Sequence, residues 1–318
     1  RPLILDGPRL YLERYHGYET QLARAVRSRL GEVPGVDEAL LETTLAALWT
    51  EPDADQMQAA RNAVRRRFSI VTGGPGTGKT TTIKRILAAL AAQAVRAGRA
   101  PRMMLMAPTG RAMAQLSAAV ADGDAPGLSP EALALLPREA YTIHRALGVR
   151  GGDLMWFQHG ADEPLNADVV VLDEASMVSH AVLSALLGAV PEGATVILVG
   201  DRNQLPAVDA GSALAELCAA ASVEGGPLSA CVTRLTTNHR SNSAIQELSS
   251  ALLDGDAVRS LALLDRGGEI RRVDPVDGCP PPLLASICDG YVPALEAARR
   301  GTPNVALTAL ESFRVLCA

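Results

Sequence analysis

The sequence has little of what would let a protein hold nucleic acid or lipid through bulk properties. Its 318 residues include 30 Lys and Arg against 35 Asp and Glu, a net charge of −5, and only 3% Phe, Trp and Tyr. Such a chain does not bind nucleic acid through overall positive potential, and base stacking is not expected from so few aromatic side chains. No uncharged apolar run reaches the roughly 18 residues that a membrane-spanning helix needs. We therefore expect no membrane partner, and we expect any nucleic-acid contact to be local.

Cysteine usage and length narrow the class of protein further. The five cysteines show no Cys-x-x-Cys spacing and follow no signal peptide, which is typical of reduced thiols in a cytoplasmic protein. A hydrophobic content of 48% excludes general disorder and indicates one large or two ordinary globular domains. The chain begins with Arg1 and ends in the apolar run Phe313-Arg-Val-Leu-Cys-Ala318, which we expect to be a strand without its continuation. We therefore interpret the chain as a piece of a longer protein.

Lysine is rare, and one of the lysines lies in a motif that binds phosphate. Lys79 and Lys84 stand against 28 arginines, so a retained lysine indicates a position that needs a compact ammonium group. Lys79 lies in Gly73-Gly-Pro-Gly-Thr-Gly-Lys-Thr80, between an expected buried strand at 68–72 and an expected helix at 81–96. This is the G-x-x-x-x-G-K-[ST] pattern in its strand–loop–helix context.

The chemistry of that loop predicts an ATP site. Backbone N–H groups of the loop and the positive end of the following helix would hold the β-phosphate. Lys79 would reach the β- and γ-phosphates, and the Thr80 hydroxyl would bind Mg²⁺. The alternative, a glycine-rich turn without a ligand, does not explain the retained lysine. The expected nucleotide-binding residues are Gly73, Gly74, Pro75, Gly76, Thr77, Gly78, Lys79, Thr80 and Thr81.

A pair of acids supplies the second part of such a site. Asp173 and Glu174 follow the apolar run 169–172, and in a buried parallel strand this places both carboxylates at the carboxyl edge of the sheet, where ligands bind. Asp173 would hold Mg²⁺, and Glu174 would orient and polarise the water that attacks the γ-phosphate. Alone, such a run is more often a strand leaving the core. The phosphate-binding loop upstream favours the metal site.

Further polar motifs follow other expected strands. Pro108-Thr-Gly-Arg-Ala112 ends a strand at 102–107, Gly200-Asp-Arg-Asn-Gln-Leu-Pro206 ends a strand at 195–200, Tyr141-Thr-Ile-His-Arg145 opens a short helix, and Asn238-His-Arg240 precedes a longer one. Strands are also expected at 169–173 and 231–235. The alternation of strands and helices predicts an α/β fold with a parallel sheet covered on both faces.

The ordered set GGPGTGKT, APTGRA, TIH, DEAS, GDRNQLP and NHR resembles the motifs of superfamily 1 DNA helicases. The forms GGPGTGKTTT and DEASM are most similar to the 5′→3′ branch, and segments 2–15 and 157–165 resemble the RecD family, the α subunits of exodeoxyribonuclease V. The resemblance implies a RecA-like P-loop NTPase domain at 53–234. Residues 1–52 show helical periodicity, and we expect strands at 269–273 and at the C-terminus. The resemblance places these parts in an N-terminal helical segment at 1–52 and in the start of a second RecA-like domain at 235–318.

The same resemblance assigns individual residues. Gln56 matches the glutamine that reads the adenine edge, with Gln58 as the alternative. Gln204 matches the glutamine that senses the γ-phosphate, and Arg240 matches an arginine that reaches it from the second domain. Lys79, Glu174, Gln204 and Arg240 are thus the expected catalytic residues. The expected contacts to single-stranded DNA are Thr109, Arg111, Thr142 and His144, although His144 could be an ordinary residue of a helix start.

As a whole, the resemblance implies an ATP-hydrolysing helicase that works with RecB-like and RecC-like subunits on DNA ends during recombinational repair. The alternatives are a stand-alone RecD-like 5′→3′ helicase, a P-loop ATPase that acts on something other than DNA, and a non-catalytic subunit with a fossil ATP site. Two further helicase motifs, one gripping DNA and one giving a second arginine to ATP, are absent from the 318 residues. We therefore expect this stretch alone to hydrolyse ATP slowly.

Overall fold

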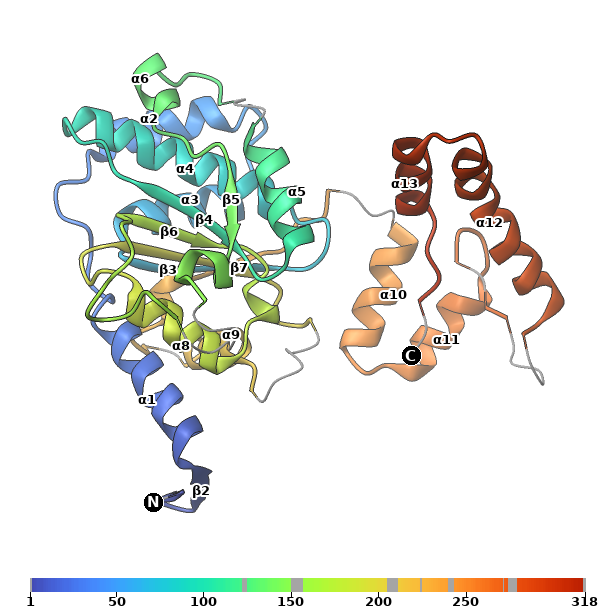
Figure 1. Ribbon diagram of the computed structural model, residues 1–318, viewed down its shortest axis with the longest axis horizontal. Coiled ribbons are helices and arrows are strands. Elements are labelled where there is room, and N and C mark those ends of the chain that lie inside the picture. Colours follow the sequence, from blue (N-terminus) through green and yellow to red (C-terminus); the bar gives the residue numbers. More distant parts are fainter. Residues whose placement is uncertain are drawn as a thin grey trace. The chain divides into compact units, whose positions relative to one another are not determined.

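The computed structural model describes residues 2–121, 125–149, 157–204, 211–223, 225–239, 243–270, 272–273 and 279–316. The chain divides into two compact units, residues 1–240 and 241–318. Figure 1 shows the first unit as a sheet with helices on both of its faces and the second as a set of helices. The predicted domain limits at residues 52 and 234 stay predictions.

Six parallel strands form the sheet of the first unit, in the order β5-β4-β6-β7-β3-β8. They are β3 (Phe68–Gly73), β4 (Met103–Ala107), β5 (Ala140–Thr142), β6 (Val169–Leu172), β7 (Thr195–Gly200) and β8 (Val232–Leu235). β3, β6 and β7 are buried along their whole length, as expected for central parallel strands that read as apolar runs. The α/β class with a parallel sheet is confirmed, and the short edge strand β5 is added to the five predicted strands.

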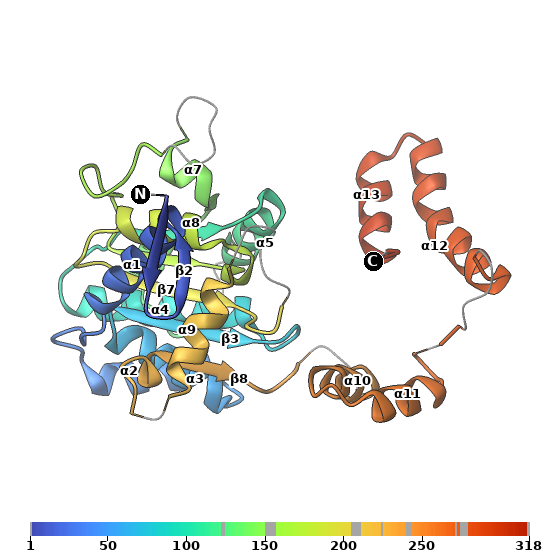
Figure 2. The same cartoon turned by 90° about the horizontal axis from the view of Figure 1, so that it is seen from below.

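Successive side chains of each strand pack against opposite layers of helices. Along β6, Val170 and Leu172 belong to one hydrophobic cluster, and Val169 and Val171 belong to the other, because side chains alternate across a sheet. The cluster of Val170 includes residues of α1 (Glu13–Arg27), α7 (Ile143–Leu147), α8 (His180–Ala189) and α9 (Ala213–Ala221). The other includes residues of α2 (Glu38–Leu48), α3 (Ala54–Arg65), α4 (Lys79–Arg96) and α5 (Gly110–Ala121). Figure 2 gives a second view of both layers. The short helix α6 (Pro130–Ala134) packs against α4.

The N-terminal segment is not helical throughout. A hairpin of β1 (Leu3–Asp6) and β2 (Arg9–Leu12) precedes α1, with Leu3 opposite Leu12 and Leu5 opposite Leu10. Gly7 in the turn has φ 57°, a left-handed value that glycine adopts without strain. The predicted N-terminal helical segment at 1–52 thus did not include the hairpin at residues 3–12. The signal was available, because Asp6-Gly7 between two apolar runs is typical of a tight hairpin.

A buried arginine ties this segment to the core. Arg29, just after α1, is 2% exposed, and its guanidinium donates to the carbonyl groups of Ala25, Leu187, Val190 and Pro191, with the Val190 contact at 2.6 Å. Three of these carbonyls lie at the C-terminal end of α8, where the helix dipole is negative and carbonyls lack helical partners. Burial lowers the pKa of Arg29. Since α1 also packs along α8, the N-terminal segment is part of the first unit.

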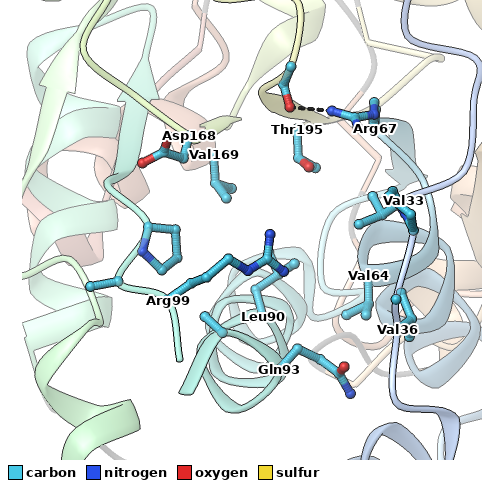
Figure 3. A pocket seen from close by; sticks show the side chains of 16 residues that line it. Val33, Val36, Val64, Arg67, Leu90, Gln93, Arg99, Asp168, Val169 and Thr195 are labelled. Carbon is cyan, nitrogen blue, oxygen red and sulfur yellow. Dashed lines mark hydrogen bonds between the residues drawn. The ribbon is translucent and has the colours of Figure 1, made fainter. Parts of the chain in front are cut away.

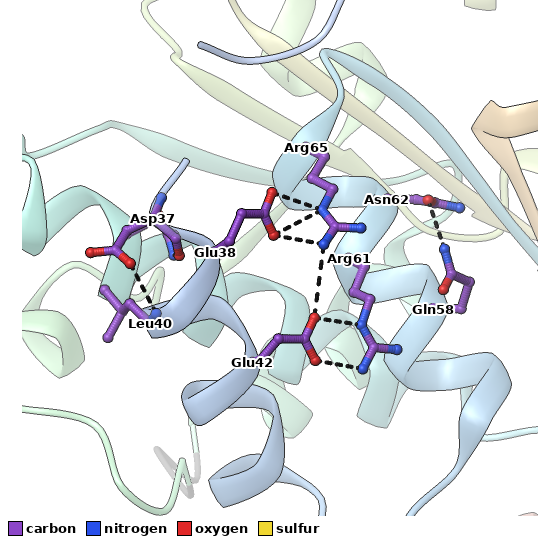
Figure 4. Close-up of polar contacts among 9 residues, drawn as sticks. Asp37, Glu38, Leu40, Glu42, Gln58, Arg61, Asn62 and Arg65 are labelled. Carbon is purple, nitrogen blue, oxygen red and sulfur yellow. Dashed lines mark hydrogen bonds and ion pairs between the residues drawn. The ribbon is translucent and has the colours of Figure 1, made fainter. Parts of the chain in front are cut away.

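Surface ion pairs join α2 and α3. Arg61 contacts Glu42 at 2.7 Å and Arg65 contacts Glu38 at 2.6 Å, as Figure 4 shows. Each such exposed pair contributes only about 0–1 kcal/mol to stability. The basic run 65–67 therefore serves protein contacts, since Arg66 also lies 4.0 Å from Glu32 and Arg67 donates to the Gly193 carbonyl.

The second unit consists of helices in its described residues. They are α10 (Ser243–Leu253), α11 (Ala257–Asp265), α12 (Pro281–Arg299) and α13 (Pro303–Ser312). α10 packs against α11 and α12 against α13, where Tyr291 meets Phe313 edge to face at 5.2 Å between ring centroids. The strands predicted at 269–273 and 313–318 are wrong for residues 269–270, 272–273 and 313–316; Arg271, Cys317 and Ala318 lie outside the described residues. A strand needs a neighbour for its backbone hydrogen bonds, and the described part of this unit offers none. Its assignment to a second RecA-like domain stays a prediction.

Among the helices of the described residues, none combines the length and the apolar character that crossing a membrane would require.

Candidate nucleotide site

The loop between β3 and α4 has the backbone of a phosphate-binding loop. Gly76 and Gly78 have φ values of 79° and 77°, which side-chain-bearing residues adopt only with strain. A Cβ atom on Gly78 would lie 2.6 Å from Gln56 Nε2, and one on Gly73 would lie 2.5 Å from Thr77 Oγ1. Both conformation and space therefore require glycine at Gly78.

The carbonyl groups of this loop are all occupied by protein donors. Lys79 Nζ donates to the Gly73 carbonyl at 2.9 Å and to the Gly74 carbonyl at 3.1 Å. The Gly78 carbonyl accepts from Thr82 N at 2.8 Å and from Thr82 Oγ1 at 2.9 Å. These local bonds hold both ends of the loop.

Donors from distant parts of the chain take the three remaining carbonyls. Asn238 Nδ2 donates to the Pro75 carbonyl at 3.0 Å, and His239 N donates to the Gly76 carbonyl at 2.8 Å. Gln56 Nε2 donates to the Thr77 carbonyl at 3.3 Å. Each carbonyl from residue 73 to residue 78 thus points toward a protein donor. The N–H groups of the loop are left for a ligand.

Those N–H groups form a site for an anion. Within the described part of the chain, the N–H groups of Gly76, Gly78, Lys79 and Thr80 donate to no acceptor. They surround the N-terminus of α4, an 18-residue helix whose dipole adds about half a positive charge at this end. A nest of free N–H groups, a helix N-terminus and a lysine ammonium together bind phosphate groups.

The acidic pair faces this loop. β7 lies between β3 and β6 in the sheet, so the carboxyl ends of these parallel strands meet at one edge. Asp173 is 8% exposed. Desolvation by burial raises the pKa of Asp173 to about 6. Three weaker effects act on the same pKa: the hydrogen bond from the Glu174 backbone N–H lowers it, the Glu174 charge raises it, and the Lys79 charge lowers it. The Lys79 charge thus favours the ionised form of a carboxylate that burial makes costly.

A magnesium ion fits the donors at this edge. A buried carboxylate held against the Glu174 N–H at 2.9 Å gains from a divalent cation, which offsets the cost of its burial. Asp173 and the Thr80 hydroxyl are the protein oxygens that would hold Mg²⁺, and the ion would supply charge neutralisation for phosphate oxygens. Glu174 has φ 51°, a conformation that costs energy for a residue with a side chain and is found at functional sites.

Gln204 belongs to the same edge. It follows β7, and its Oε1 accepts a hydrogen bond from Ser176 Oγ at 2.5 Å. The loop that carries it is fixed to the end of β3, because Arg202 N donates to Thr72 Oγ1 at 3.1 Å. The structure therefore brings Lys79, Thr80, Asp173, Glu174 and Gln204 to one edge of the sheet. The fourth expected catalytic residue, Arg240, lies outside the described residues.

Gln56 lies beneath the loop and is 3% exposed. Its Oε1 accepts from Trp49 Nε1 at 3.1 Å and from Arg85 Nη1 at 3.3 Å, and its Nε2 lies 3.2 Å from His239 Nε2. The amide is thus used by protein partners, and adenine reading by Gln56 stays a prediction. The alternative, Gln58, instead bonds Asn62 on the surface of α3.

Sequence reasoning missed the residues that support Gln56 and the loop. The Arg85 guanidinium lies 4.7 Å from the centre of the Trp49 ring, and His239 Nε2 also lies 3.1 Å from Asp53 Oδ2. The motif that contains Asn238 and His239 predicts a role for Arg240 but none for these two residues. Their contacts join positions more than 160 residues apart in the sequence. No local sequence pattern indicates that such distant residues touch.

The expected DNA-contact residues lie at the neighbouring part of the same edge. Ala107 pairs with Thr142 where β4 meets β5, so the segments that carry Thr109 and Thr142 start side by side. Both threonine hydroxyls accept from backbone N–H groups at a helix start, Thr109 from Ala112 and Thr142 from Arg145. Arg111 is exposed. His144 lies 6.0 Å from Phe157 between ring centroids. DNA contact by these four residues stays a prediction.

A cavity of about 440 Å³ lies at the opposite edge of the sheet, where β3, β6 and β7 begin. Figure 3 shows Arg67 and Arg99 beside the apolar side chains of Val33, Val36 and Val64. None of the predicted site residues lines this cavity. The predicted nucleotide-binding residues therefore lie at the other edge, where the strands end.

Comparisons with known proteins find a family model and relatives that match this chain. A family model described as an AAA domain matches residues 56–210. The chain is 38% identical over 324 residues to the RecD subunit of the RecBCD enzyme of Mycolicibacterium smegmatis. The alignment covers 99% of this chain and 55% of that subunit. The ATP-dependent RecD2 DNA helicase of Deinococcus radiodurans is 35% identical over 217 residues, covering 67% of this chain and 26% of its own length.

Among solved structures, the chain resembles a Pif1 helicase from Bacteroides in complex with ADP-AlF3 and single-stranded DNA, with 18% identity and a TM-score of 0.41. The match covers 71% of this chain and 52% of the Pif1 chain. At this TM-score the likeness supports no inference about function. The chain spans just over half the length of the mycobacterial RecD subunit. Along its whole length the chain is therefore similar to RecD subunits, and its phosphate-binding loop and acidic pair lie within the residues that match the AAA domain.

Proposed function

We propose that this chain is the ATP-hydrolysing part of a 5′→3′ DNA helicase that works with RecB-like and RecC-like subunits on DNA ends during recombinational repair. The observation that carries the proposal is the phosphate-binding loop, whose carbonyls are all occupied while N–H groups stay free for a ligand, beside Asp173 and Glu174. This arrangement is suited to binding and cleaving the terminal phosphate of ATP. The direction of movement and the partner subunits rest on the family alone.

Each residue of the site has a proposed role. Lys79 leaves its loop carbonyls and contacts the β- and γ-phosphates when ATP binds. Thr80 and Asp173 are the residues that would hold Mg²⁺, which would supply positive charge to the phosphate oxygens. Glu174 orients the attacking water and takes up its proton. Gln204 contacts the γ-phosphate, and Arg240 adds positive charge there.

DNA binding is proposed along the ends of β4 and β5. The loops that begin with Thr109 and Thr142 start side by side, and the exposed Arg111 can reach a phosphate. With a net charge of −5, DNA binding rests on a few local contacts and should weaken strongly with salt.

The four cysteines that the structure describes are free thiols, in line with our proposal of a cytoplasmic protein.

A second candidate is a helicase that acts without RecB-like and RecC-like subunits. It is favoured by the RecD2 DNA helicase of Deinococcus radiodurans, which is 35% identical over the part that aligns. Co-purification of the full-length protein with two further subunits would favour the first candidate, and unwinding by the purified protein alone would favour the second.

The test of the proposed chemistry is Glu174→Gln in the full-length protein. The amide keeps the size of the side chain but cannot accept the proton of the attacking water, so ATP binding should persist while hydrolysis falls by a factor of about a hundred or more. Binding is measured with a fluorescent ATP analogue and hydrolysis by phosphate release with single-stranded DNA present. Loss of binding together with hydrolysis would instead give Glu174 a structural role.

The 318-residue chain, which lacks two helicase motifs, should hydrolyse ATP slowly. Rapid DNA-stimulated ATP hydrolysis by this chain would contradict that expectation.

A further inference from the structure

A buried serine hydroxyl contacts the side chain proposed to sense the γ-phosphate. Ser176 lies in the 3₁₀ turn Ala175–Met177 that follows Glu174 and is 5% exposed. Its Oγ donates to Gln204 Oε1 at 2.5 Å, whereas the Gln204 side chain is otherwise exposed. The sequence motifs gave Ser176 no role.

This hydrogen bond decides which end of the glutamine amide is available. A hydroxyl that donates to Oε1 fixes that oxygen toward Ser176, so the amide N–H₂ points elsewhere. Within the described part of the chain, Gln204 Nε2 donates to no acceptor. A phosphate oxygen accepts hydrogen bonds and repels a carbonyl oxygen, so only the N–H₂ end can bind it favourably.

The backbone around this contact is held at both ends. A Cβ atom on Gly200 would lie 3.0 Å from Ser176 N and 3.3 Å from Ala175 N, so the turn after the acidic pair lies directly against the end of β7. On the other side, Arg202 N bonds Thr72 Oγ1 at the end of β3. A small movement of the Glu174 turn would therefore be passed to Gln204 through the Ser176 hydroxyl.

We propose that Ser176 is a positioning residue, which holds Gln204 with its amide N–H₂ toward the γ-phosphate of bound ATP. The proposal rests on the proposed ATP site. It makes Ser176 a determinant of the preference for ATP over ADP, because ADP has no γ-phosphate for Gln204 to contact. Without the hydroxyl, the amide is free to present its oxygen to the phosphate.

The experiment compares ATP and ADP affinities of the full-length protein, in the presence of Mg²⁺, for the wild type and Ser176→Ala. We expect ATP affinity to fall about tenfold, the effect of one hydrogen bond to a charged group, and ADP affinity to change by less than about twofold. Ser184→Ala is the matched control. Ser184 is also a buried serine of the first unit, and its hydroxyl has no hydrogen-bond partner, so its loss should leave both affinities unchanged.

A double-mutant cycle separates positioning from a structural effect. In a Gln204→Ala background, Ser176→Ala should change ATP affinity no further, because the side chain that it orients is gone. Ser176→Thr keeps the hydroxyl and should keep the preference for ATP. Equal losses for ATP and ADP, no loss at all, or an undiminished loss in the Gln204→Ala background would each overturn the proposal. A wild-type protein that binds neither nucleotide would instead overturn the proposed function.

Discussion

Asp173 should lower the stability of the protein in the absence of ligand, and this cost can be measured. Its pKa is raised from 3.8 to about 6, mainly by burial. Below about pH 3 the carboxyl is mostly neutral in both the folded and the unfolded states, and above about pH 7 it is mostly ionised in both. The folded state therefore loses stability as pH rises through this window. At about 1.4 kcal/mol per pH unit, the difference corresponds to a loss of about 3 kcal/mol.

The perturbation is Asp173→Asn, which keeps the shape and removes the charge. At pH 7 without Mg²⁺ or nucleotide, the variant should be more stable than the wild type by about 2–3 kcal/mol, and the difference should vanish near about pH 3. Urea unfolding of the chain at a series of pH values, followed by circular dichroism, measures this difference. Added Mg²⁺ and nucleotide should stabilise the wild type and have little effect on the variant.

The control is Asp168→Asn, an exposed acid just before the same strand that pairs with Arg102 at 3.4 Å. Its removal should change stability by about 1 kcal/mol or less, as for surface pairs. A less stable Asp173→Asn protein at pH 7, or a difference from the wild type that does not depend on pH between 4 and 6, would refute the reasoning. Either result would mean that the Asp173 carboxylate does not destabilise the fold in the absence of a bound cation.

Two further changes test the fold around the site. Arg29→Ala should lower the free energy of unfolding in urea by about 3 kcal/mol, because it leaves buried carbonyls at the end of α8 without a donor. Arg27→Ala, at an exposed position, should lower it by less than about 0.5 kcal/mol. Equal losses for the two variants would mean that the Arg29 contacts contribute nothing to stability. Gly78→Ala should reduce ATP affinity at least tenfold, because φ 77° and the 2.6 Å approach to Gln56 leave no room for a methyl group, while Gly74→Ala meets no neighbour within 4 Å and should bind more tightly than Gly78→Ala.

The sheet and the residues along its carboxyl edge could be predicted because their signals are local. Buried parallel strands read as apolar runs, and loops at their carboxyl ends carry the polar residues. This logic placed Lys79 near Asp173 although they are far apart in the sequence. It also predicted that Gln204 would follow a strand of the same sheet.

Other parts depend on partners that no local pattern identifies. The strands expected at 269–273 and 313–318 rested on local sequence alone, which does not supply a neighbouring strand. Gln56 is held by Trp49, Arg85 and His239. These residues follow α2, lie on α4 and follow β8, and they come together only in the folded chain. The Ser176 contact depends on how closely the turn after β6 approaches the end of β7, a distance set by Gly200.

The central claim is that the loop from Gly73 to Thr80 holds the phosphates of ATP, and the two lysines of the chain allow a direct test. Both lie on α4, but only Lys79 contacts the loop. In the full-length protein, Lys79→Ala should abolish DNA-stimulated ATP hydrolysis while the protein stays folded, and Lys84→Ala should retain it. Unchanged hydrolysis in Lys79→Ala would contradict the account.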